Sequence, residues 1–255
     1  MPDAIPPVSP AMIAGTTGAA IVIGAGDATG GAIAAAFARD GLVAVPVRRT
    51  AAALAPLAAR IASEGGACLP IGADARDEAA MVALFDRVEA EVGPVAVAVF
   101  NIGANSPMSL LDETERRYRT IWELCALGGF LMAREAARRM VSRGRGTILF
   151  TGATASVRGS AGFAAFSGGK HALRALAQST ARELGPRGIH VAHIVIDGAI
   201  DTDFIRTQFP ARYATKAEDG ILDPEHIAAG YVMLHHQPRD AWTHELDLRP
   251  WRETF

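Results

Sequence analysis

Short apolar segments alternate along the chain with longer stretches of helical periodicity. The expected strands are Ala20–Ile23, Val43–Val47, Cys68–Ile71, Val95–Phe100, Thr147–Thr151, Ile189–Ile196 and Thr243–Leu248. The expected helices are Gly31–Arg39, Ala51–Ser63, Glu78–Val92, Asp112–Val141, Gly162–Leu184 and Pro224–His235. Runs that are apolar at successive positions, such as VAVAVF, are typical of strands buried on both faces. The pattern predicts an α/β fold: a doubly wound parallel sheet of about seven strands with helices on both faces.

A glycine-rich turn joins the first expected strand to the first helix, in the run AAIVIGAGDATGG. Gly24, Gly26 and Gly30 allow backbone to approach a ligand closely. The helix that begins near Thr29 directs unpaired N–H groups at the same point, where a pyrophosphate fits. The turn therefore predicts a nucleotide site.

Residues 198–222 form the longest stretch without clear periodicity. The stretch follows the carboxyl end of an expected strand, where α/β sheets bind their ligands. We expect a mobile lid over a substrate; the alternative is a variable surface loop.

Composition narrows the class of protein. The 255 residues contain no linker and no repeat, so we expect one domain from residue 18 to 255. Residues 1–17 hold four prolines and no basic residue, which is typical of a flexible N-terminal arm rather than a secretion signal. The net charge of −2 and the mixed charges argue against nucleic-acid and membrane partners, and no apolar run approaches membrane-spanning length.

Two distant cysteines, Cys68 and Cys125, have no metal-ligand spacing around them. They predict free thiols in a reducing compartment, the cytoplasm, and no metal site.

Several fragments in order resemble the short-chain dehydrogenase/reductase family from about Ala19 to Leu248. The glycine turn is similar to its T-G-x-x-x-G-x-G signature, with Ile23 for the threonine and Ala28 for the middle glycine. GADARD follows the third expected strand, FNIG the fourth and DGAIDT the sixth, the last resembling a P-G-x-x-x-T segment. The resemblance implies contacts to a nicotinamide cofactor from Gly24, Gly26, Thr29, Gly30, Asp74, Ala75, Asn101, Gly103, Lys170, Gly198, Ile200 and Thr202.

The end of the second expected strand indicates which cofactor is bound. A carboxylate there suits a ribose hydroxyl, whereas this chain has Arg48 and Arg49. Because guanidinium groups suit a phosphate, the sequence favours NADP(H) over NAD(H). The alternative is that both arginines are solvated and bind no ligand.

The usual catalytic groups are mostly replaced. Family members carry Y-x-x-x-K, in which the tyrosine exchanges a proton and the lysine holds the nicotinamide ribose and lowers the tyrosine's pKa. Here Phe166 stands at the tyrosine and Lys170 at the lysine. The family's serine and asparagine fall on Ala153 and Cys125, so only Lys170 persists.

Other groups are candidate substitutes for the missing proton donor, each with a structural alternative. Thr151 and Thr154 flank Ala153 and either orient a carbonyl or satisfy backbone groups. Ser167 lies about 100° from Phe166 around the helix and is not expected to reach the same point. The remaining candidates are His171 (packing or subunit contact favoured), Tyr213 (a lid residue), Asp201 (a base or a helix cap), His193 (core) and Cys125 (inert burial favoured over a nucleophile).

Three functions remain open. The first is an NADP(H)-dependent oxidoreductase with an unusual proton donor, acting on a small carbonyl, alcohol, imine or enone. The second is a non-catalytic cofactor-binding partner, and the third a non-redox lyase or isomerase in the same pocket.

Partners follow from the same resemblance, which implies a homodimer or homotetramer packed through the two long helices. Their small residues Ala126, Gly128, Gly129, Ala133, Ala172 and Ala175 would permit close contact. Trp251 and Phe255 either dock on a neighbouring subunit or belong to a disordered tail.

Overall fold

The computed structural model describes residues 18–254; the expected arm of residues 1–17 and Phe255 lie outside them. A seven-stranded, wholly parallel sheet has the order β3-β2-β1-β4-β5-β6-β7. Its strands are β1 Ala19–Ile23, β2 Val43–Arg48, β3 Ile71–Gly72, β4 Val95–Phe100, β5 Gly146–Thr151, β6 Ile189–Ile196 and β7 Glu245–Leu248. The predicted doubly wound parallel sheet is confirmed.

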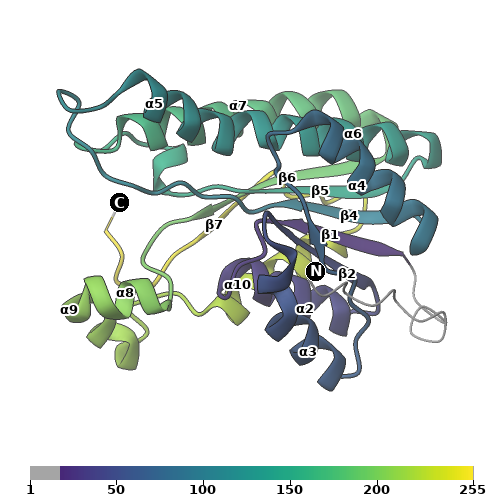
Figure 1. Cartoon of the computed structure of the whole chain (residues 1–255), viewed down its shortest axis with the longest axis horizontal. Helices are drawn as coiled ribbons and strands as arrows, with labels where there is room; N and C mark the ends of the chain where they lie inside the picture. The colour runs from purple at the N-terminus through teal and green to yellow at the C-terminus, as the bar shows by residue number, and fades with distance from the viewer. Residues whose placement is uncertain (1–17, 255) are drawn as a thin grey trace.

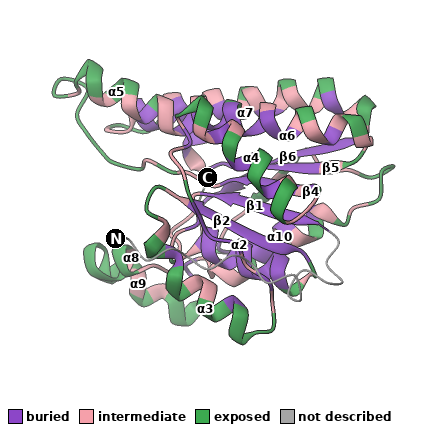
Figure 2. Ribbon diagram, turned by 45° about the vertical axis from the view of Figure 1, so that its right-hand side comes forward, coloured by how far each residue is buried: buried purple, intermediate pink, exposed green. Residues whose placement is uncertain are grey.

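Helices cover both faces of the sheet (Figure 1). On one face lie α2 Thr29–Arg39, α3 Ala55–Ser63 and α10 Pro224–His235. On the other lie α4 Glu78–Glu91, α5 Glu115–Trp122, α6 Gly128–Arg143 and α7 Ala164–Leu184. Each face has its own apolar core, and the strands between them are buried along most of their length (Figure 2). This burial on both sides explains the continuous apolar runs of the strands.

Two of the expected elements differ most from the structure. The third strand is only Ile71–Gly72, with Cys68 in an isolated bridge to Ala44, because Pro70 has no N–H to continue the ladder. The expected helix over Asp112–Val141 begins later, at Glu115, where the Thr114 hydroxyl caps it by accepting from the Arg117 N–H. A π-helical turn, Glu123–Leu127, then separates α5 from α6.

Residues 198–222 are not a structureless loop. They contain α8 Asp203–Gln208, α9 Pro210–Ala214 and a short 3₁₀ turn, Thr215–Glu218. Pro210 begins a new helix because it cannot donate within the preceding one. These short helices stand below the carboxyl edge of the sheet at the left of Figure 1, with the loop before α5 above them.

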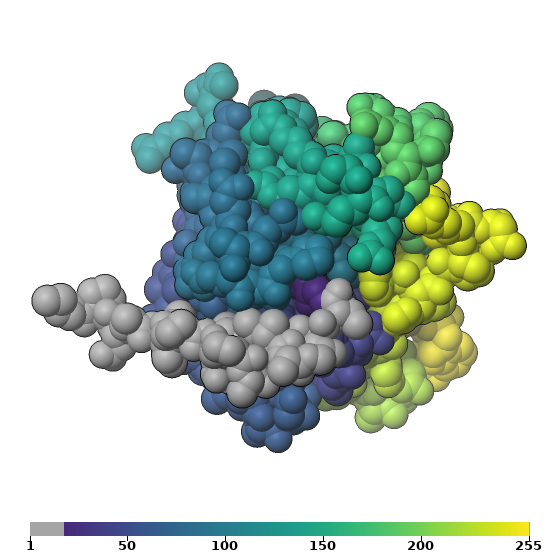
Figure 3. All heavy atoms as spheres, turned by 90° about the vertical axis from the view of Figure 1, so that its right-hand side faces the viewer, coloured from purple at the N-terminus to yellow at the C-terminus, as the bar shows by residue number. Residues whose placement is uncertain are grey.

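The chain changes direction across the sheet between β1 and β4, since β2 and β3 lie on one side and β5 to β7 on the other. In such sheets the crevice outside this switch point is the usual ligand site. The opposite end, seen in Figure 3, brings together distant segments: the Arg239 guanidinium after α10 donates to the Gly144 carbonyl after α6, at 2.8 Å.

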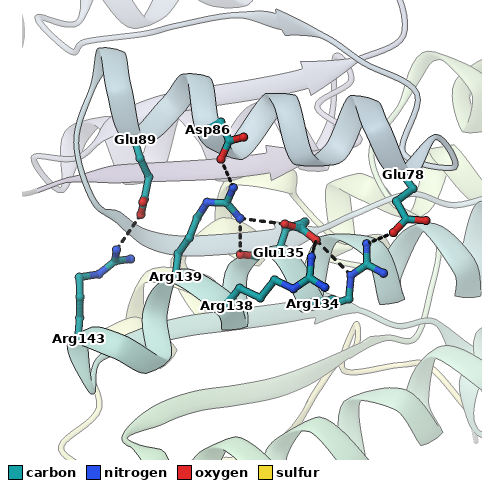
Figure 4. Close-up of polar contacts among 8 residues, drawn as sticks. All are labelled: Glu78, Asp86, Glu89, Arg134, Glu135, Arg138, Arg139 and Arg143. Carbon is teal, nitrogen blue, oxygen red and sulfur yellow. Dashed lines mark hydrogen bonds and ion pairs between the residues drawn. The ribbon is translucent and has the colours of Figure 1, made fainter.

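An ionic network joins α4 to α6 on the outside of the fold (Figure 4). The Glu135 carboxylate is nearly fully buried and accepts from Arg134, Arg138 and Arg139. Arg139 also binds Asp86, while Arg134 binds Glu78 and Arg143 binds Glu89. Because the network lies away from the carboxyl edge of the sheet, it fixes α4 on α6 and takes no part in the site.

His193, in β6, is a core residue, as the sequence predicted. Its side chain is fully buried, its Nδ1 lies 3.0 Å from Glu245 Oε2, and a Cβ on Gly152 would lie 2.4 Å from its Nε2. Burial lowers the pKa of His193 to about 4, against the partial opposition of Glu245.

This pKa predicts acid sensitivity. In the unfolded chain His193 binds a proton below its ordinary pKa of about 6.5. In the folded chain it binds a proton only below a pH of about 4. Stability should therefore be full above pH 6.5 and fall between pH 6.5 and 4, by up to ~3 kcal/mol from this residue. In urea unfolding at several pH values, His193→Gln should flatten the profile, and the exposed His226→Gln should not. An unchanged slope in His193→Gln would assign the acid sensitivity elsewhere.

Among residues 18–254, no helix has both the length and the apolar character needed to cross a bilayer.

Candidate active site

The glycine turn after β1 is tightly packed on one side and open on the other. Gly24 has a φ of +89°, and its carbonyl accepts from the Asn101 side-chain amide at 3.1 Å. A Cβ on Gly30 would lie 2.3 Å from the Gly24 oxygen, so only glycine fits there. Above Gly26, by contrast, a Cβ would meet nothing within 4 Å. Gly24 and Gly30 thus shape the turn, and Gly26 leaves room for a ligand.

The start of α2 faces this room. Its N-cap is Ala28, which has no side chain able to cap the helix, and no acidic residue occurs in the first turn. Thr29 lines the neighbouring cavity. Uncapped N–H groups at a helix start attract an anion, so the turn fits the diphosphate of a dinucleotide.

A cavity of about 480 Å³ extends from the turn toward β2 and β3. It is lined by Gly24, Gly26, Arg48, Arg49, Asp74, Ala75, Asn101 and Gly103, among others. The structure therefore brings six of the expected cofactor residues together with Arg48 and Arg49.

Some charged residues of this cavity already form ion pairs within the chain, and others do not. The Arg76 side chain donates to both oxygens of Asp74, and these hydrogen bonds lower the pKa of Asp74 to about 2. Arg48 lies 3.7 Å from the exposed Asp27 and donates weakly to the Ala53 carbonyl. Arg49 is exposed, and its charge acts on Asp74 without a close ion pair among residues 18–254. The end of β2 is therefore available to a negative ligand.

A second cavity, of about 410 Å³, lies beyond Asn101 at the ends of β4, β5 and β6. Ala153, Thr154, Phe166, Lys170, Gly198 and Ile200 line it with Asn101 and Gly103. The two cavities share Asn101 and Gly103, which places the expected nicotinamide end beside the altered catalytic positions.

Lys170 is buried at the floor of the second cavity. Its ammonium donates to the Thr151 carbonyl at 2.8 Å and to the Ile102 carbonyl at 3.0 Å. It lies 5.9 Å from the centre of the Phe166 ring, within the range of a cation–π contact. Burial lowers the pKa of Lys170. The two carbonyls leave a further N–H for a ligand.

Cys125 does not line either cavity. It is fully buried in the π-helical turn, and a Cβ on Gly169 of α7 would lie 2.8 Å from its Cβ. Burial raises the pKa of Cys125, only partly opposed by the nearby Lys170 charge. Burial likewise raises the pKa of Cys68 to about 12. Both cysteines are free thiols, and the raised pKa argues against a nucleophilic role for Cys125.

Neither threonine hydroxyl beside Ala153 satisfies a backbone group, so that alternative is wrong. The Thr151 hydroxyl bonds the Tyr231 hydroxyl at 2.6 Å. The Thr154 hydroxyl donates to the Asp197 carboxylate. This contact was not predictable from the sequence, because Thr154 and Asp197 are 43 positions apart.

Other expected site residues lie elsewhere. Thr202 caps α8 by accepting from the Ile205 N–H at 3.1 Å, and it does not line either cavity. Asp201 is therefore not the cap; it pairs with Lys216 at 2.5 Å. Tyr213, in α9, and His171, exposed on α7, are also absent from the lining of both cavities. Ser167 was expected to point away, yet it borders the second cavity because that cavity spans more than one face of α7.

The carboxyl-terminal segment packs on its own chain. The Trp251 indole donates to the Glu218 carbonyl at 3.1 Å, Arg252 pairs with Glu218, and Glu253 pairs with Arg212. Pro250 lies against Gly198, where a Cβ would approach it to 2.7 Å. A disordered tail is therefore wrong as far as Thr254; docking on a neighbouring subunit stays a prediction.

Within residues 18–254 no group of three or more His, Cys, Asp or Glu side chains is placed to hold a metal ion.

Comparison with known proteins decides the family. The family model described as short chain dehydrogenase matches residues 18–212. The chain belongs to this family.

Individual relatives agree with this assignment. Versicolorin reductase of Emericella nidulans is 33% identical over 185 residues, which is 72% of this chain and 69% of the relative. Among eight curated relatives, the chain covers from 52% to 88% of the relative's own length.

Solved structures share the fold. A short-chain dehydrogenase from Rhodopseudomonas palustris is 41% identical, with a TM-score of 0.79 over 92% of this chain and 99% of that one. A metagenomic short-chain oxidoreductase in complex with NADP has a TM-score of 0.80 at 23% identity, over 92% and 98% of the two chains. The family matches support an oxidoreductase that binds a nicotinamide cofactor.

Proposed function

We propose that this short-chain dehydrogenase is an NADP(H)-dependent oxidoreductase acting on a small carbonyl, alcohol, imine or enone without a tyrosine proton donor. The observation that carries the proposal is the junction of two cavities. A glycine turn with two arginines at the end of β2 leads directly to a cavity lined by Phe166 and Lys170.

The preference for NADP(H) is supported by charge. Arg48 ends β2 and Arg49 follows it, and the acid that lines the same cavity, Asp74, already binds Arg76. A guanidinium pairs with the 2′-phosphate that distinguishes NADP(H), whereas a free carboxylate would repel it. The related metagenomic oxidoreductase was crystallised with NADP.

The residues around the second cavity would hold the reactants. When bound, the cofactor supplies or accepts the hydride. Lys170 would direct its remaining N–H at the ribose, while Asn101 fixes the glycine turn through Gly24. The Phe166 ring supplies an apolar wall that excludes water from the reacting carbons. Such positioning supports hydride transfer even without a strong acid.

A non-catalytic cofactor-binding protein is the second candidate. It is favoured by one specific observation: Ala153 and Phe166 have no hydroxyl where the family pattern has serine and tyrosine, and the Cys125 thiol is buried outside both cavities.

An activity assay distinguishes the two candidate functions. Purified protein is mixed with NADPH and with carbonyl, imine and enone compounds, and NADPH oxidation is followed. We expect NADPH oxidation with at least one compound, and its loss in Lys170→Ala. Tight NADPH binding with no turnover would support the non-catalytic protein. Equal or tighter binding of NADH than NADPH in calorimetry would refute the cofactor assignment.

We further propose a homodimer or homotetramer that forms through α6 and α7, with Ala133 but not Gly128 and Gly129 at the contact. Gly128 and Gly129 pack inside the subunit, where an added Cβ would crowd Phe100 and Leu173. The exposed feature is instead a groove between α6 and α7, lined by Phe130, Ala133, Ala137, Val141, Leu176 and Leu184 with a charged rim. An apolar floor with charges of both signs suits a second copy of the chain.

Phe130 is the largest half-exposed side chain of this groove, at 42% exposure. Phe130→Lys would place a cation beside Arg134, which lies 5.4 Å from the ring centre. We expect light scattering to show a smaller assembly for Phe130→Lys and the native assembly for Phe204→Lys, on α8. An unchanged mass for Phe130→Lys would place the interface elsewhere.

A further inference from the structure

The second cavity offers few groups that can exchange a proton with a substrate. Its hydroxyl-bearing side chains are Thr29, Thr151, Thr154, Ser160 and Ser167. Of these, only Thr154 is hydrogen-bonded to a carboxylate. A hydroxyl alone is a weak acid and a weak base, but a carboxylate behind it can take up or return the proton.

Asp197 is built into the wall behind Thr154. It follows β6, is 3% exposed, and its N–H donates to the Leu248 carbonyl at 2.9 Å. One carboxylate oxygen accepts from Thr154, and the other lies 3.7 Å from the Arg249 guanidinium. Arg249 also pairs with Asp247, so the tail segment helps to hold the carboxylate in place.

We propose that Thr154 is the catalytic residue that exchanges a proton with the substrate oxygen, and that Asp197 is the positioning residue that orients its hydroxyl and stores the proton. The proposal rests on the proposed oxidoreductase function. It assigns to a threonine and an aspartate the task that relatives give to a tyrosine.

The step balances in the oxidation direction. The carbinol C–H bond breaks and its hydride passes to NADP⁺, while the substrate O–H proton moves to Thr154 Oγ1 and the C=O bond forms. At the same time the Thr154 proton passes to the Asp197 carboxylate, along the hydrogen bond already present. Reduction reverses these transfers, beginning with Asp197 protonated and solvent restoring the proton afterwards.

The neighbouring groups are less suited to this task. Thr151 bonds Tyr231, whose pKa is raised by complete burial, so that phenol is a poor proton source. The Ser167 oxygen is buried and has no partner among the described residues. Lys170 is held by two carbonyl groups at the cavity floor. Among the described residues that line the cavity, only Thr154 also contacts an acid.

The activity test compares Thr154→Val, Thr154→Ser and Asp197→Asn with wild type on 4-nitrobenzaldehyde, cyclohexenone and a cyclic imine. We expect Thr154→Val and Asp197→Asn to lose ~10²–10⁴-fold in kcat with little change in KM, and Thr154→Ser to restore most of it. The solvent isotope effect of wild type should diminish in Asp197→Asn. Thr120→Val, on α5, and Asp240→Asn, after α10, lie outside the second cavity, serve as matched controls and should behave as wild type.

A second readout needs no turnover. Thermal unfolding of Thr154→Val, Asp197→Asn and the double variant should give non-additive shifts in Tm, because the two side chains share one hydrogen bond. Additive shifts would overturn the contact, and full turnover by Thr154→Val would overturn the relay alone. Wild type that binds NADPH yet reduces none of the compounds would overturn the relay and the oxidoreductase proposal together.

Discussion

Phe166→Tyr should create or raise ordinary carbonyl reductase activity, by ~10²–10⁴-fold if the new phenol serves as a general acid. The Phe166 ring already lines the second cavity and lies 5.9 Å from the Lys170 ammonium. A tyrosine in the same rotamer would point its hydroxyl into the cavity, and the lysine charge would lower the phenol's pKa. NADPH oxidation with simple aldehydes and ketones, compared with wild type, measures the gain.

Phe163→Tyr is the matched control, because Phe163 lines the same cavity but lies outside the helix turn that carries Lys170. It should add a phenol without adding activity. A gain limited to Phe166→Tyr, increased further by Ala153→Ser, would indicate that the pocket retains the family's geometry. A folded, NADPH-binding Phe166→Tyr that stays inactive would show that the cavity has diverged beyond these positions.

The fold was predictable from the sequence because local pattern and global architecture agree. Strands such as β4, which is apolar throughout, and β6, which is apolar except for His190 and His193, were predicted to the residue, as was α10, whose start is marked by Asp223 and Pro224. Less predictable were features that depend on partners distant in sequence. The π-helical turn at Glu123–Leu127 lies in a segment whose side-chain periodicity continues through it. The short helices after Asp203 are held partly by the carboxyl-terminal tail.

The site residues also differ in how far the sequence could predict them. Gly24, Gly30 and Asn101 were predictable because the turn requires them, and the structure joins them directly. The pairing of Thr154 with Asp197 was not, since neither residue matches the family pattern and their contact depends on the register of β5 and β6. The sequence thus identified which catalytic groups of the family pattern are replaced. Only the structure showed which other polar groups lie near those positions.

The double variant Arg48→Gln/Arg49→Gln should weaken NADPH binding by ~10²–10³-fold and leave NADH binding nearly unchanged. Hydrogen bonds to a charged group contribute about 1.5–3 kcal/mol each, and both guanidinium groups line the cavity at the end of β2. NADH has no 2′-phosphate for them to bind, so its dissociation constant should not respond. Titration calorimetry with both cofactors gives the ratio directly.

Arg60→Gln, on α3, controls for the loss of positive charge near the site. Arg60 binds Glu64 and Glu225 rather than lining the cavity, so it should leave both dissociation constants unchanged. The salt dependence supplies a further distinction, because pairing with the phosphate should weaken as ionic strength rises in wild type but not in the double variant. If the binding of NADPH and of NADH weakens equally in Arg48→Gln/Arg49→Gln, the arginines shape the cavity without binding the 2′-phosphate. The proposed preference for NADP(H) would then be wrong.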